Sequence, residues 1–440
     1  MAGEWATVRI GDLADSISDT HKFGKDHLVF LNTSDVLLGK LLHHSYSAVR
    51  DWPGQAKKSI RRGDILFSEI RPANGRWAYV DIEADDYVVS TKLMVIRART
   101  NKAFPRFLYH FLTSAKITGW LQHLAESRSG TFPQITFDQI AELELPLPPV
   151  TVQAKIASLL DTIDDKIELN RRMSETLEAM ARALFKSWFV DFDPVRAKME
   201  GRPSTSSGQA IPGLPKHLAD LFPDSFEGSE LGEIPKGFEE RALYDCADYI
   251  NGSAFRNDDF SQDRVGLPVI KIGELKDGIT SQTKFTEAIL ELKYRITSGD
   301  ILFSWSGSPD TSIDTFVWTG GEGWLNQHIF KMQFNRPEEK FFVHFLLRHL
   351  KPVFIEIARN KQTTGLGHVT AQDLKRLKTV FPPDDFLRAF NRLAEPLFQK
   401  AYSNSCESRT LAALRDTLLP KLLTGEIGVK DAETTLHEAS

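Results

Sequence analysis

The sequence has only two cysteines among its 440 residues, Cys246 and Cys406. A disulfide framework or a cysteine-rich zinc site needs more, so both are excluded, and so little cysteine is typical of proteins in a reducing cytoplasm. No apolar run approaches the ~18 residues that a membrane-spanning helix requires. The opening residues, MAGEWATVRIGDL, lack the apolar segment of a signal peptide. We therefore expect a cytoplasmic protein with no membrane partner.

Neither sign of charge is in large excess. Lys plus Arg number 54 and Asp plus Glu number 59, which gives a net charge of −5 at pH 7. A protein that is basic overall is thereby excluded, and a polyanion would have to bind at a local patch. Hydrophobic residues at 41% and charged residues at 26% are ordinary for folded domains. At this length we expect more than one domain.

The signatures of common nucleotide-dependent and metal-dependent enzymes are also missing. The sequence contains no G-x-x-x-x-G-K-[ST] phosphate loop and no G-x-G-x-x-G loop. The twelve histidines are scattered, without the H-E-x-x-H spacing of a zinc site. An amino-methyltransferase would carry an Asn- or Asp-Pro-Pro-aromatic loop, and none is present. These absences disfavour a self-contained enzyme.

What the sequence does contain is an internal repeat. The hexapeptide GDILFS at 63–68 recurs letter for letter at 299–304. Farther along, His110-Phe111-Leu112 matches His344-Phe345-Leu346, and the Pro-Pro pair at 148–149 matches the pair at 382–383. Self-similarity of this extent indicates one ancestral unit of roughly 190 residues used twice.

Both copies have the same internal order. Short runs rich in Val, Ile and Phe, such as DILFS and YVVS, predict strands. A long helical segment then begins after each Pro-Pro pair, because proline blocks helix on its N-terminal side. We predict an α/β (α+β) fold: two mixed α/β domains joined by two long helices that form an antiparallel coiled coil, with an internal pseudo-twofold repeat. The expected ranges are 1–150 and 237–383 for the domains, 151–190 and 384–427 for the helices, 191–236 for a linker and 428–440 for a flexible tail.

The two helical segments carry matching apolar stripes. In the first, a heptad-like pattern runs through Ile156, Leu160, Ile163, Ile167, Asn170, Met173, Leu177, Met180 and Leu184. The second repeats it 234 residues later, including a polar residue in the middle, Asn404. If Asn170 and Asn404 oppose each other, they fix the register and the antiparallel pairing of the coiled coil at some cost in stability. The alternatives are that each helix covers only its own domain and that both asparagines are exposed.

Polar and basic residues cluster in the loops between the predicted strands. Arg, Asn, Gln and Ser are the side chains that reach base edges, while Lys suits phosphates. The first copy is nevertheless balanced, with 18 basic and 17 acidic residues over 1–150, so only such loop clusters could face DNA. The candidate DNA-binding residues are Lys57, Lys58, Arg61, Arg62, Arg71, Asn74, Arg76 and Arg128 in the first copy, and Arg256, Asn257, Ser306, Ser308, Arg359, Lys361 and Gln362 in the second.

Three stretches resemble a known family. They are LPLPPVTVQAKIASLLDTIDDKIELNRRMSETLEAMARALFKSWFVDFDPVRAKMEG, LFPDSFEGSELGEIPKGF and LRDTLLPKLLTGEI. All are similar to specificity subunits of type I restriction–modification systems, and the resemblance covers nearly the whole chain. The WFVDFDP run from Trp188 belongs to the family's central signature. Its aromatic residues either contact a partner or pack against the end of the first helix.

The resemblance implies a non-catalytic subunit with two target-recognition domains, each reading one half of a bipartite site in double-stranded DNA. It also implies that two modification (methyltransferase) subunits dock on the chain and that restriction subunits join them. No cofactor is then expected in this chain. S-adenosylmethionine for adenine-N6 methylation, ATP and Mg²⁺ would be held by the partner subunits.

Two other functions stay open from the residues themselves. Asp310, followed by Glu338, Glu339 and Lys340, loosely matches a metal-dependent nuclease in which carboxylates hold Mg²⁺ and a lysine steadies the nucleophile. The first copy lacks this set, and Glu338 and Glu339 also suit the start of a helix. The other alternative is a coiled-coil scaffold that does not bind DNA.

Overall fold

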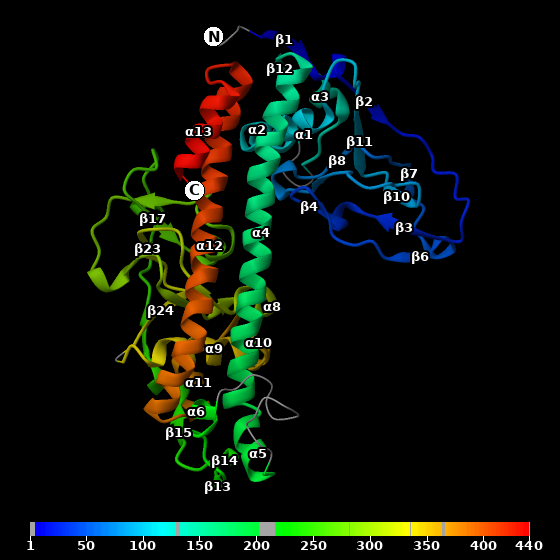
Figure 1. Ribbon diagram of the computed structural model, residues 1–440. Helices are drawn as coiled ribbons and strands as arrows, with labels where there is room; N and C mark the ends of the chain where they lie inside the picture. The colour runs from blue at the N-terminus through cyan, green and yellow to red at the C-terminus, as the bar shows by residue number, and fades with distance from the viewer. Residues whose placement is uncertain are drawn as a thin grey trace. The chain divides into compact units, whose positions relative to one another are not determined.

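The computed structural model describes residues 5–128, 133–201, 216–280, 282–334, 336–362 and 366–439. The chain divides into two compact units. Unit 1 comprises Met1–Leu169 and Glu407–Ser440, and unit 2 comprises Asn170–Cys406. Each unit holds one mixed α/β domain together with part of each long helix, so the helices are shared between the units (Figure 1).

Two four-stranded sheets form the domain of unit 1. The first has the order β2-β11-β8-β9 and is antiparallel, and the second has the order β6-β3-β10-β7 with β3 and β10 parallel. Strand β1 pairs with β12 beside them. The bounds are β1 (Ala6–Arg9), β2 (Ala14–Ile17), β3 (His27–Leu31), β6 (Tyr46–Ala48), β7 (Ala56–Ser59), β8 (Asp64–Ser68), β9 (Trp77–Tyr79), β10 (Tyr87–Ser90), β11 (Leu93–Ala98) and β12 (Glu144–Leu147). Also present are the short pair β4 (Val36–Leu37) and β5 (Lys40–Leu41), and helices α1 (Pro105–Thr113), α2 (Ala115–Arg128) and α3 (Phe137–Ala141).

Unit 2 repeats this topology strand for strand. Its sheets have the orders β16-β24-β20-β22 and β18-β17-β23-β19, with β17 and β23 parallel, and β15 pairs with β26. The strands are β15 (Glu239–Ala242), β16 (Asp248–Asn251), β17 (Leu267–Ile270), β18 (Phe285–Thr286), β19 (Arg295–Ile296), β20 (Ile301–Ser304), β22 (Asp314–Val317), β23 (Gly323–Leu325), β24 (Ile329–Gln333) and β26 (Lys378–Phe381). The helices are α9 (Glu339–His349), α10 (Lys351–Asn360) and α11 (Ala371–Arg376), with α7 (Ile272–Asp277), α8 (Pro309–Ser312) and the pair β21 (Ser306–Gly307) and β25 (Gly367–His368) added. The shared topology confirms the internal repeat.

The repeated hexapeptide forms the start and the body of a central strand in each unit. Gly63 and Gly299 adopt φ of +91° and +95°, a left-handed conformation that favours glycine. The following aspartate closes the turn, since Asp64 Oδ2 accepts from the Arg61 backbone N–H at 2.9 Å and Asp300 Oδ2 accepts from that of Thr297 at 2.8 Å. The residues ILFS that follow are all buried. The identity of the two hexapeptides therefore has a structural cause.

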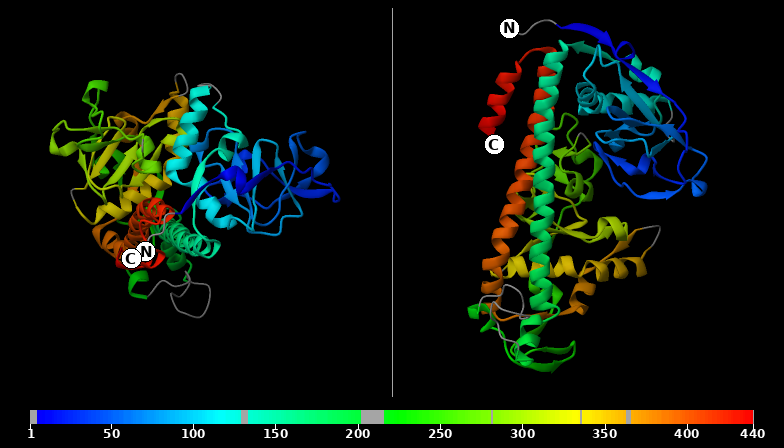
Figure 2. Two further views of the ribbon diagram at one scale, coloured as in Figure 1. Left: turned by 90° about the horizontal axis from the view of Figure 1, so that it is seen from above. Right: turned by 45° about the vertical axis from the view of Figure 1, so that its right-hand side comes forward.

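The long helices are α4 (Val150–Phe189) and α12 (Asp384–Thr424), and they run side by side in opposite directions (Figures 1 and 2). In unit 1 they are joined by ion pairs from Asp164 to Arg415, at 2.8 Å, and from Lys166 to Glu407, at 3.3 Å. In unit 2 the Ser174 hydroxyl donates to the Ala401 carbonyl at 3.2 Å. As residue numbers rise along α4 they fall along α12, which is the predicted antiparallel pairing.

The predicted apolar stripe holds along most of α4 but is wrong at Met180, which is 53% exposed. Beyond Leu177 the buried positions are Ala181, Phe185 and Trp188 instead. An α-helix has 3.6 residues per turn, so a strict heptad pattern drifts by about 20° per heptad and the buried face moves forward. Asn170 and Asn404 are each 1% exposed, which excludes the alternative that they are ordinary surface residues.

The segment between the copies packs onto unit 2. It contains α5 (Asp193–Met199), α6 (Lys216–Ala219) and the hairpin of β13 (Phe226–Ser229) and β14 (Gly232–Pro235). Leu218 and Phe222 are buried in the core of unit 2. So are Trp188, Phe189 and Phe192 of the WFVDFDP run, with the Trp188 and Phe222 rings 5.0 Å apart. Of the two readings of these aromatics, packing against the helix end is the one observed.

The C-terminal residues are not the flexible tail that the sequence predicted. Val429–Ala439 form helix α13. Ala432 is fully buried in the core of unit 1, and Val429 and Leu436 pack against the same core. Apolar residues at positions i, i+3 and i+7 make one helix face, and burying that face orders the segment. Within the described ranges, none of the helices combines the length and apolar character needed to cross a membrane.

Candidate nucleic-acid interface

Three segments of unit 1 meet just beyond the end of strand β8, and we call them the rim of unit 1: residues 69–71, 91–92 and 133–135. Backbone hydrogen bonds fasten them together. The N–H of Glu69 donates to the Lys92 carbonyl at 3.2 Å, that of Ile135 to the Glu69 carbonyl at 2.9 Å, and that of Arg71 to the Pro133 carbonyl at 3.1 Å. The rim is therefore a fixed backbone frame that presents polar side chains.

The rim of unit 2, residues 305–307, 327–328 and 367–369, repeats this frame after β20. The N–H of Trp305 donates to the His328 carbonyl at 3.4 Å and that of Val369 to the Trp305 carbonyl at 2.8 Å. Ser306 pairs with His368 in the β21–β25 ladder, as Ile70 pairs with Gln134 in unit 1. Two loop regions that are far apart in sequence are thus brought together in the same way in both units.

The side chains on the two frames have different chemistry. In unit 1 the rim is charged: the Lys92 ammonium lies 3.8 Å from the Glu69 carboxylate, and the Lys92 side chain is 48% exposed. In unit 2 it is aromatic, with the Trp305 ring 5.6 Å from that of His328 and 5.9 Å from that of His368. Burial and the nearby His368 lower the pKa of His328, so its imidazole is neutral at pH 7 and offers one donor and one acceptor.

Of the candidate residues in unit 1, Arg71 lies exposed on the rim itself and Asn74 lies exposed beside it, at the end of the short 3₁₀ helix Pro72–Asn74. Lys57, Arg61 and Arg62 are exposed elsewhere on the domain, and Arg62 lies 3.5 Å from Glu83. The side chain of Arg128 lies outside the described part of the chain.

Two candidates in unit 1 point inward. The Lys58 ammonium donates to the carbonyls of Thr91 and Leu93 at 3.1 and 2.8 Å, and burial lowers its pKa. The Arg76 guanidinium donates to the Ser34 carbonyl at 2.9 Å and so holds the neighbouring β4–β5 hairpin. Lys58 thus supports the backbone of the rim from beneath.

In unit 2 the contacts of α8 with α10 and of β21 with β25 bring five candidates into one region. Ser306 is buried and its hydroxyl lies 2.9 Å from His368 Nδ1, while Ser308 is exposed at the start of α8. Arg359 pairs with Asp310, Lys361 pairs with Asp373 at 2.5 Å, and Gln362 is exposed. Arg256 and Asn257 lie on a different loop, where Asn257 lines a polar groove with Phe260 and Lys284.

Glu69, Lys92 and Gln134 of the first rim and His368 of the second were not predicted from the sequence, whereas Trp305 and His328 lie in polar loop stretches of the second copy but were not among the candidate residues. One signal could have found them. Each flanks the repeated hexapeptide or its partner segment at matching positions, yet the two copies differ there. The candidates were instead chosen by residue type, which favours Arg and Lys wherever they occur.

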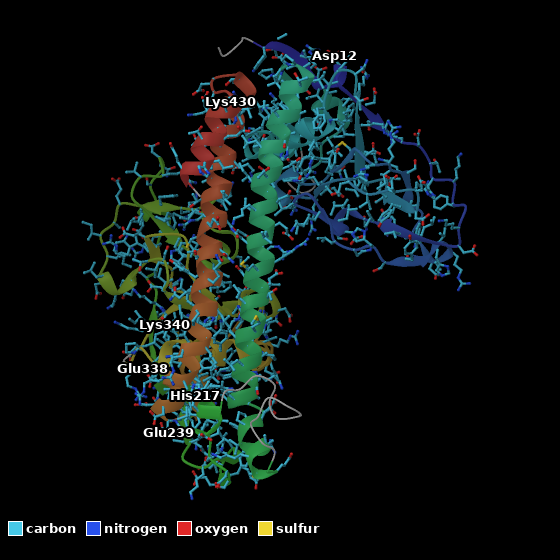
Figure 3. The ribbon with its side chains drawn as sticks, in the orientation of Figure 1. Asp12, His217, Glu239, Glu338, Lys340 and Lys430 are labelled. Atoms are coloured by element: carbon cyan, nitrogen blue, oxygen red, sulfur yellow. The ribbon has the colours of Figure 1, made fainter. Side chains whose placement is uncertain are left out.

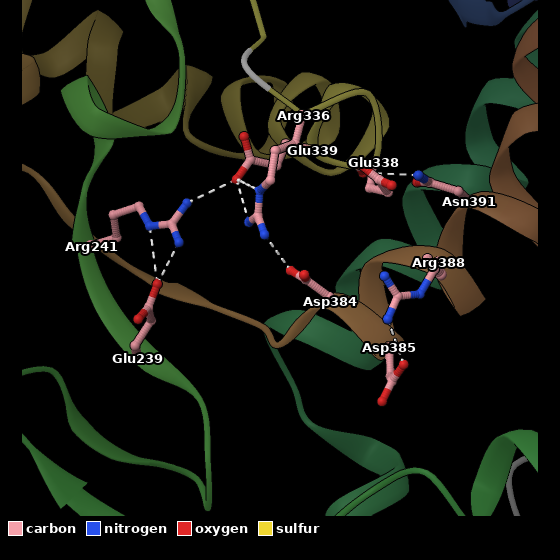
Figure 4. Close-up of polar contacts among 9 residues, drawn as sticks. All are labelled: Glu239, Arg241, Arg336, Glu338, Glu339, Asp384, Asp385, Arg388 and Asn391. Carbon is pink, nitrogen blue, oxygen red and sulfur yellow. Dashed lines mark hydrogen bonds and ion pairs between the residues drawn. The ribbon is translucent and has the colours of Figure 1, made fainter.

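Figure 3 labels Glu338 and Lys340 of the nuclease-like set, and the side chains of Asp310, Glu339 and Lys340 make structural contacts. The buried Glu339 carboxylate accepts from Arg241 at 3.1 Å and from Arg336 at 2.6 Å, and Arg336 also binds Asp384 (Figure 4). Lys340 donates to the Gly299 carbonyl, and Asp310 pairs with Arg359. Among the residues that the structure describes, no three His, Cys, Asp or Glu side chains are grouped to hold a metal ion. This arrangement gives the nuclease hypothesis no support.

A charged cluster anchors the domain of unit 1 to helix α4. The Asp161 carboxylate lies 2.8 Å from Arg106 Nε and 2.7 Å from His110 Nε2, both on α1. Burial raises the pKa of Asp161, but the hydrogen bond from His110 and the charges of His110 and Arg106 outweigh it and lower that pKa below its usual range. Beside this cluster, Arg415 of α12 binds Asp164 of α4. The rim of unit 1 thus belongs to a domain held by ion pairs.

The equivalent place in unit 2 contains a cavity of about 200 Å³, whose lining is largely apolar but includes the ion pair between Arg348 and Glu178. His344, the counterpart of His110, lies there against the Phe398 ring, and burial lowers its pKa to about 3. Strand register puts Thr315 where unit 1 has Trp77, and the repeat puts Ala181 where it has Arg415. Smaller residues at these positions account for the cavity.

The arrangement is that of a protein with two similar polar surfaces, one on each unit. The family model described as the type I restriction modification DNA specificity domain matches residues 2–179 and 235–385. The chain belongs to this family of type I specificity subunits. It is 36% identical to the type I restriction enzyme HindI specificity subunit of Haemophilus influenzae, over 96% of this chain and 100% of that one.

More distant relatives include the type I restriction enzyme MjaIX specificity subunit of Methanocaldococcus jannaschii, which is 28% identical over 74% of this chain and 69% of that one. Among solved structures, the S subunit of a type I restriction-modification system from M. genitalium aligns over 95% of this chain and 96% of that chain, with 14% identity and a TM-score of 0.49.

Proposed function

We propose that this specificity subunit reads a bipartite DNA site, with each unit reading one half and the paired helices α4 and α12 setting the spacer. The observation that carries the proposal is the pair of rims: one backbone frame, built twice, with different side chains. A homodimer with two identical rims would read two identical halves, whereas two different rims in one chain suit an asymmetric site.

The same proposal assigns the chemistry to partner subunits. Two modification subunits that bind S-adenosylmethionine would dock on the helices and methylate adenine, and restriction subunits that use ATP and Mg²⁺ would join them. Each half-site contact alone would be weak. Joining both on one spacer raises the effective concentration of the second contact once the first has formed.

The charge of the chain supports such a division. With a net charge of −5, the chain has no overall excess of positive charge to offer the phosphates, and each neutralised phosphate contributes to the salt dependence of binding. The partner subunits would then supply much of the contact with the backbone. We expect the isolated chain to bind its site much more weakly than the complex, with a shallower dependence of log K on log salt.

Domain exchange tests the reading role. Residues 237–383 are replaced by the corresponding domain of the Haemophilus relative, and the hybrid is produced with the modification subunits. Sequencing of methylated adenines should show one half-site changed and the other kept. If both halves changed, the units would not be independent readers. If salt-titrated binding showed the isolated chain to bind as tightly as the complex, the division of phosphate contacts would be wrong.

A further inference from the structure

We propose that the side chains of the two rims determine which bases each half-site contains: Glu69, Lys92 and Gln134 in unit 1, and Trp305, His328 and His368 in unit 2. This inference rests on the proposed function and narrows it to six positions. Most of them lie outside the clusters of arginine and lysine that residue type alone would select.

The divergence between the copies begins sharply where strands β8 and β20 end. Residues 64–68 and 301–304 form equivalent buried strands in the two units. Each strand ends in a buried serine, Ser68 or Ser304. The next residue is Glu69 in one unit and Trp305 in the other, although its backbone N–H and carbonyl make the same two hydrogen bonds in both. Folding therefore does not require these side chains to differ. A difference confined to the side chains of a shared frame is what a change of binding specificity requires.

The rim of unit 1 presents side chains whose chemistry matches particular base edges. A carboxylate such as that of Glu69 accepts from the cytosine N4 amino group, and a lysine such as Lys92 donates to guanine O6 and N7. Gln134 is exposed and has both a donor and an acceptor, as adenine requires. Lys58 fixes the backbone of residues 91–93 from beneath through its two hydrogen bonds. We assign Lys58 to positioning the rim rather than to contacting DNA.

The rim of unit 2 contains no Lys, Arg, Asp or Glu, yet it is rich in directional hydrogen-bonding groups. The Trp305 indole N–H donates to Asn251 Oδ1 at 3.0 Å, which fixes the ring. The Ser306 hydroxyl holds His368 through its Nδ1, and the side chain of His328 is partly exposed. The neutral imidazole of His328, and that of His368 with its Nδ1 side occupied by Ser306, match base edges that differ from those preferred by a carboxylate and an ammonium.

The experiment exchanges single rim residues between the units, so that each substitution introduces a side chain that the other copy already carries on the same frame. Lys92→His is made in unit 1 and His328→Lys in unit 2, and each is produced with the modification subunits. Arg50→Ala and Lys293→Ala, at exposed positions away from the rims, are the controls. Sites of adenine methylation are then mapped by sequencing, and thermal unfolding of each variant is recorded.

We expect Lys92→His to change the preference at one base pair of one half-site by about tenfold or more, with the other half unchanged. His328→Lys should do the same to the opposite half, and the controls should keep both halves. If either substitution lowers the melting temperature, the milder Lys92→Gln and His328→Asn replace it. Folded rim variants that keep the original motif overturn the inference while leaving the bipartite function intact. A wild-type complex that methylates without sequence preference would instead overturn the proposed function.

Discussion

Replacing Asp161 by asparagine should loosen the domain of unit 1 from helix α4. The Asp161 carboxylate lies 2.8 Å from Arg106 Nε and 2.7 Å from His110 Nε2. The asparagine keeps the size of the side chain but removes the charge, so the half-buried guanidinium of Arg106 loses its partner. Glu395 lies at the corresponding position of α12 and is exposed, which makes Glu395→Gln a matched control.

The magnitude follows from the exposure of the pair. Removing one partner of a fully buried ion pair costs about 3–5 kcal/mol, whereas exposed pairs contribute about 0–1 kcal/mol. The side chains of Asp161 and Arg106 are 26% and 27% exposed, so solvent screens the pair in part. We expect a loss of about 2 kcal/mol in the free energy of unfolding, or about 4–8 °C in melting temperature for a unit of this size.

Thermal and urea unfolding of the full chain measure the loss, and acidification tests its cause. The folded-state pKa of Asp161 is lowered by its partners. The stability that this carboxylate adds is therefore complete above its unfolded pKa of about 3.9 and is lost as the pH falls through the folded pKa. The difference between wild type and Asp161→Asn should be constant near neutral pH and shrink below about pH 4. If Asp161→Asn unfolded like Glu395→Gln at pH 7, the anchoring role would be refuted.

Three further changes give distinct expected outcomes. Thr315→Val should leave the free energy of unfolding unchanged or raise it by up to about 1 kcal/mol, because the buried hydroxyl has no hydrogen-bond partner among the described residues. Thr118→Val removes a hydrogen bond to the Ser114 carbonyl and should lower the free energy of unfolding by about 1 kcal/mol. Equal effects of the two substitutions in urea unfolding would contradict this. Asn170→Leu combined with Asn404→Leu should stabilise the chain by about 1–2 kcal/mol but allow other registers of α4 and α12, which cysteine cross-linking between the helices detects; a single register would show that the asparagines do not set it. Adding seven residues to α4 after Leu169 and seven to α12 after Cys406 lengthens each helix by ~10 Å and keeps the heptad phase. Methylation mapping should then show a spacer about three base pairs longer, with both half-sites kept. Changed half-sites with the original spacer would show that the helices do not set the spacer length.

The repeat in the sequence predicted the architecture because the repeated residues are fixed by local backbone conformation and burial. Gly63 and Gly299 need a left-handed φ, and the buried strands after them need apolar residues, so both copies preserve the same letters. The Pro-Pro pairs likewise mark where α4 and α12 begin. Met180 was misplaced because the heptad template ignores the drift of a real helix, and the tail was misjudged because its apolar face spans only Val429, Ala432 and Leu436.

The candidate site was harder to predict because its geometry is set by distant segments. Lys57 and Lys58 are adjacent, but successive strand residues point to opposite sides, so one is exposed and the other donates inward to residues 91 and 93. Glu69 and Trp305 could not be identified from the sequence because their equivalence depends on backbone hydrogen bonds from the distant segments 133–135 and 367–369. Residue type indicated DNA-binding chemistry but not which side chains the fold presents.

We propose that one frame, built twice with different rims, reads two different sequences. Single-molecule sequencing of methylated adenines in cells that carry this chain with its modification subunits tests it most directly. We expect a motif of two unlike halves separated by a fixed number of unspecified base pairs. A motif with identical inverted halves, or a single uninterrupted motif, would contradict it.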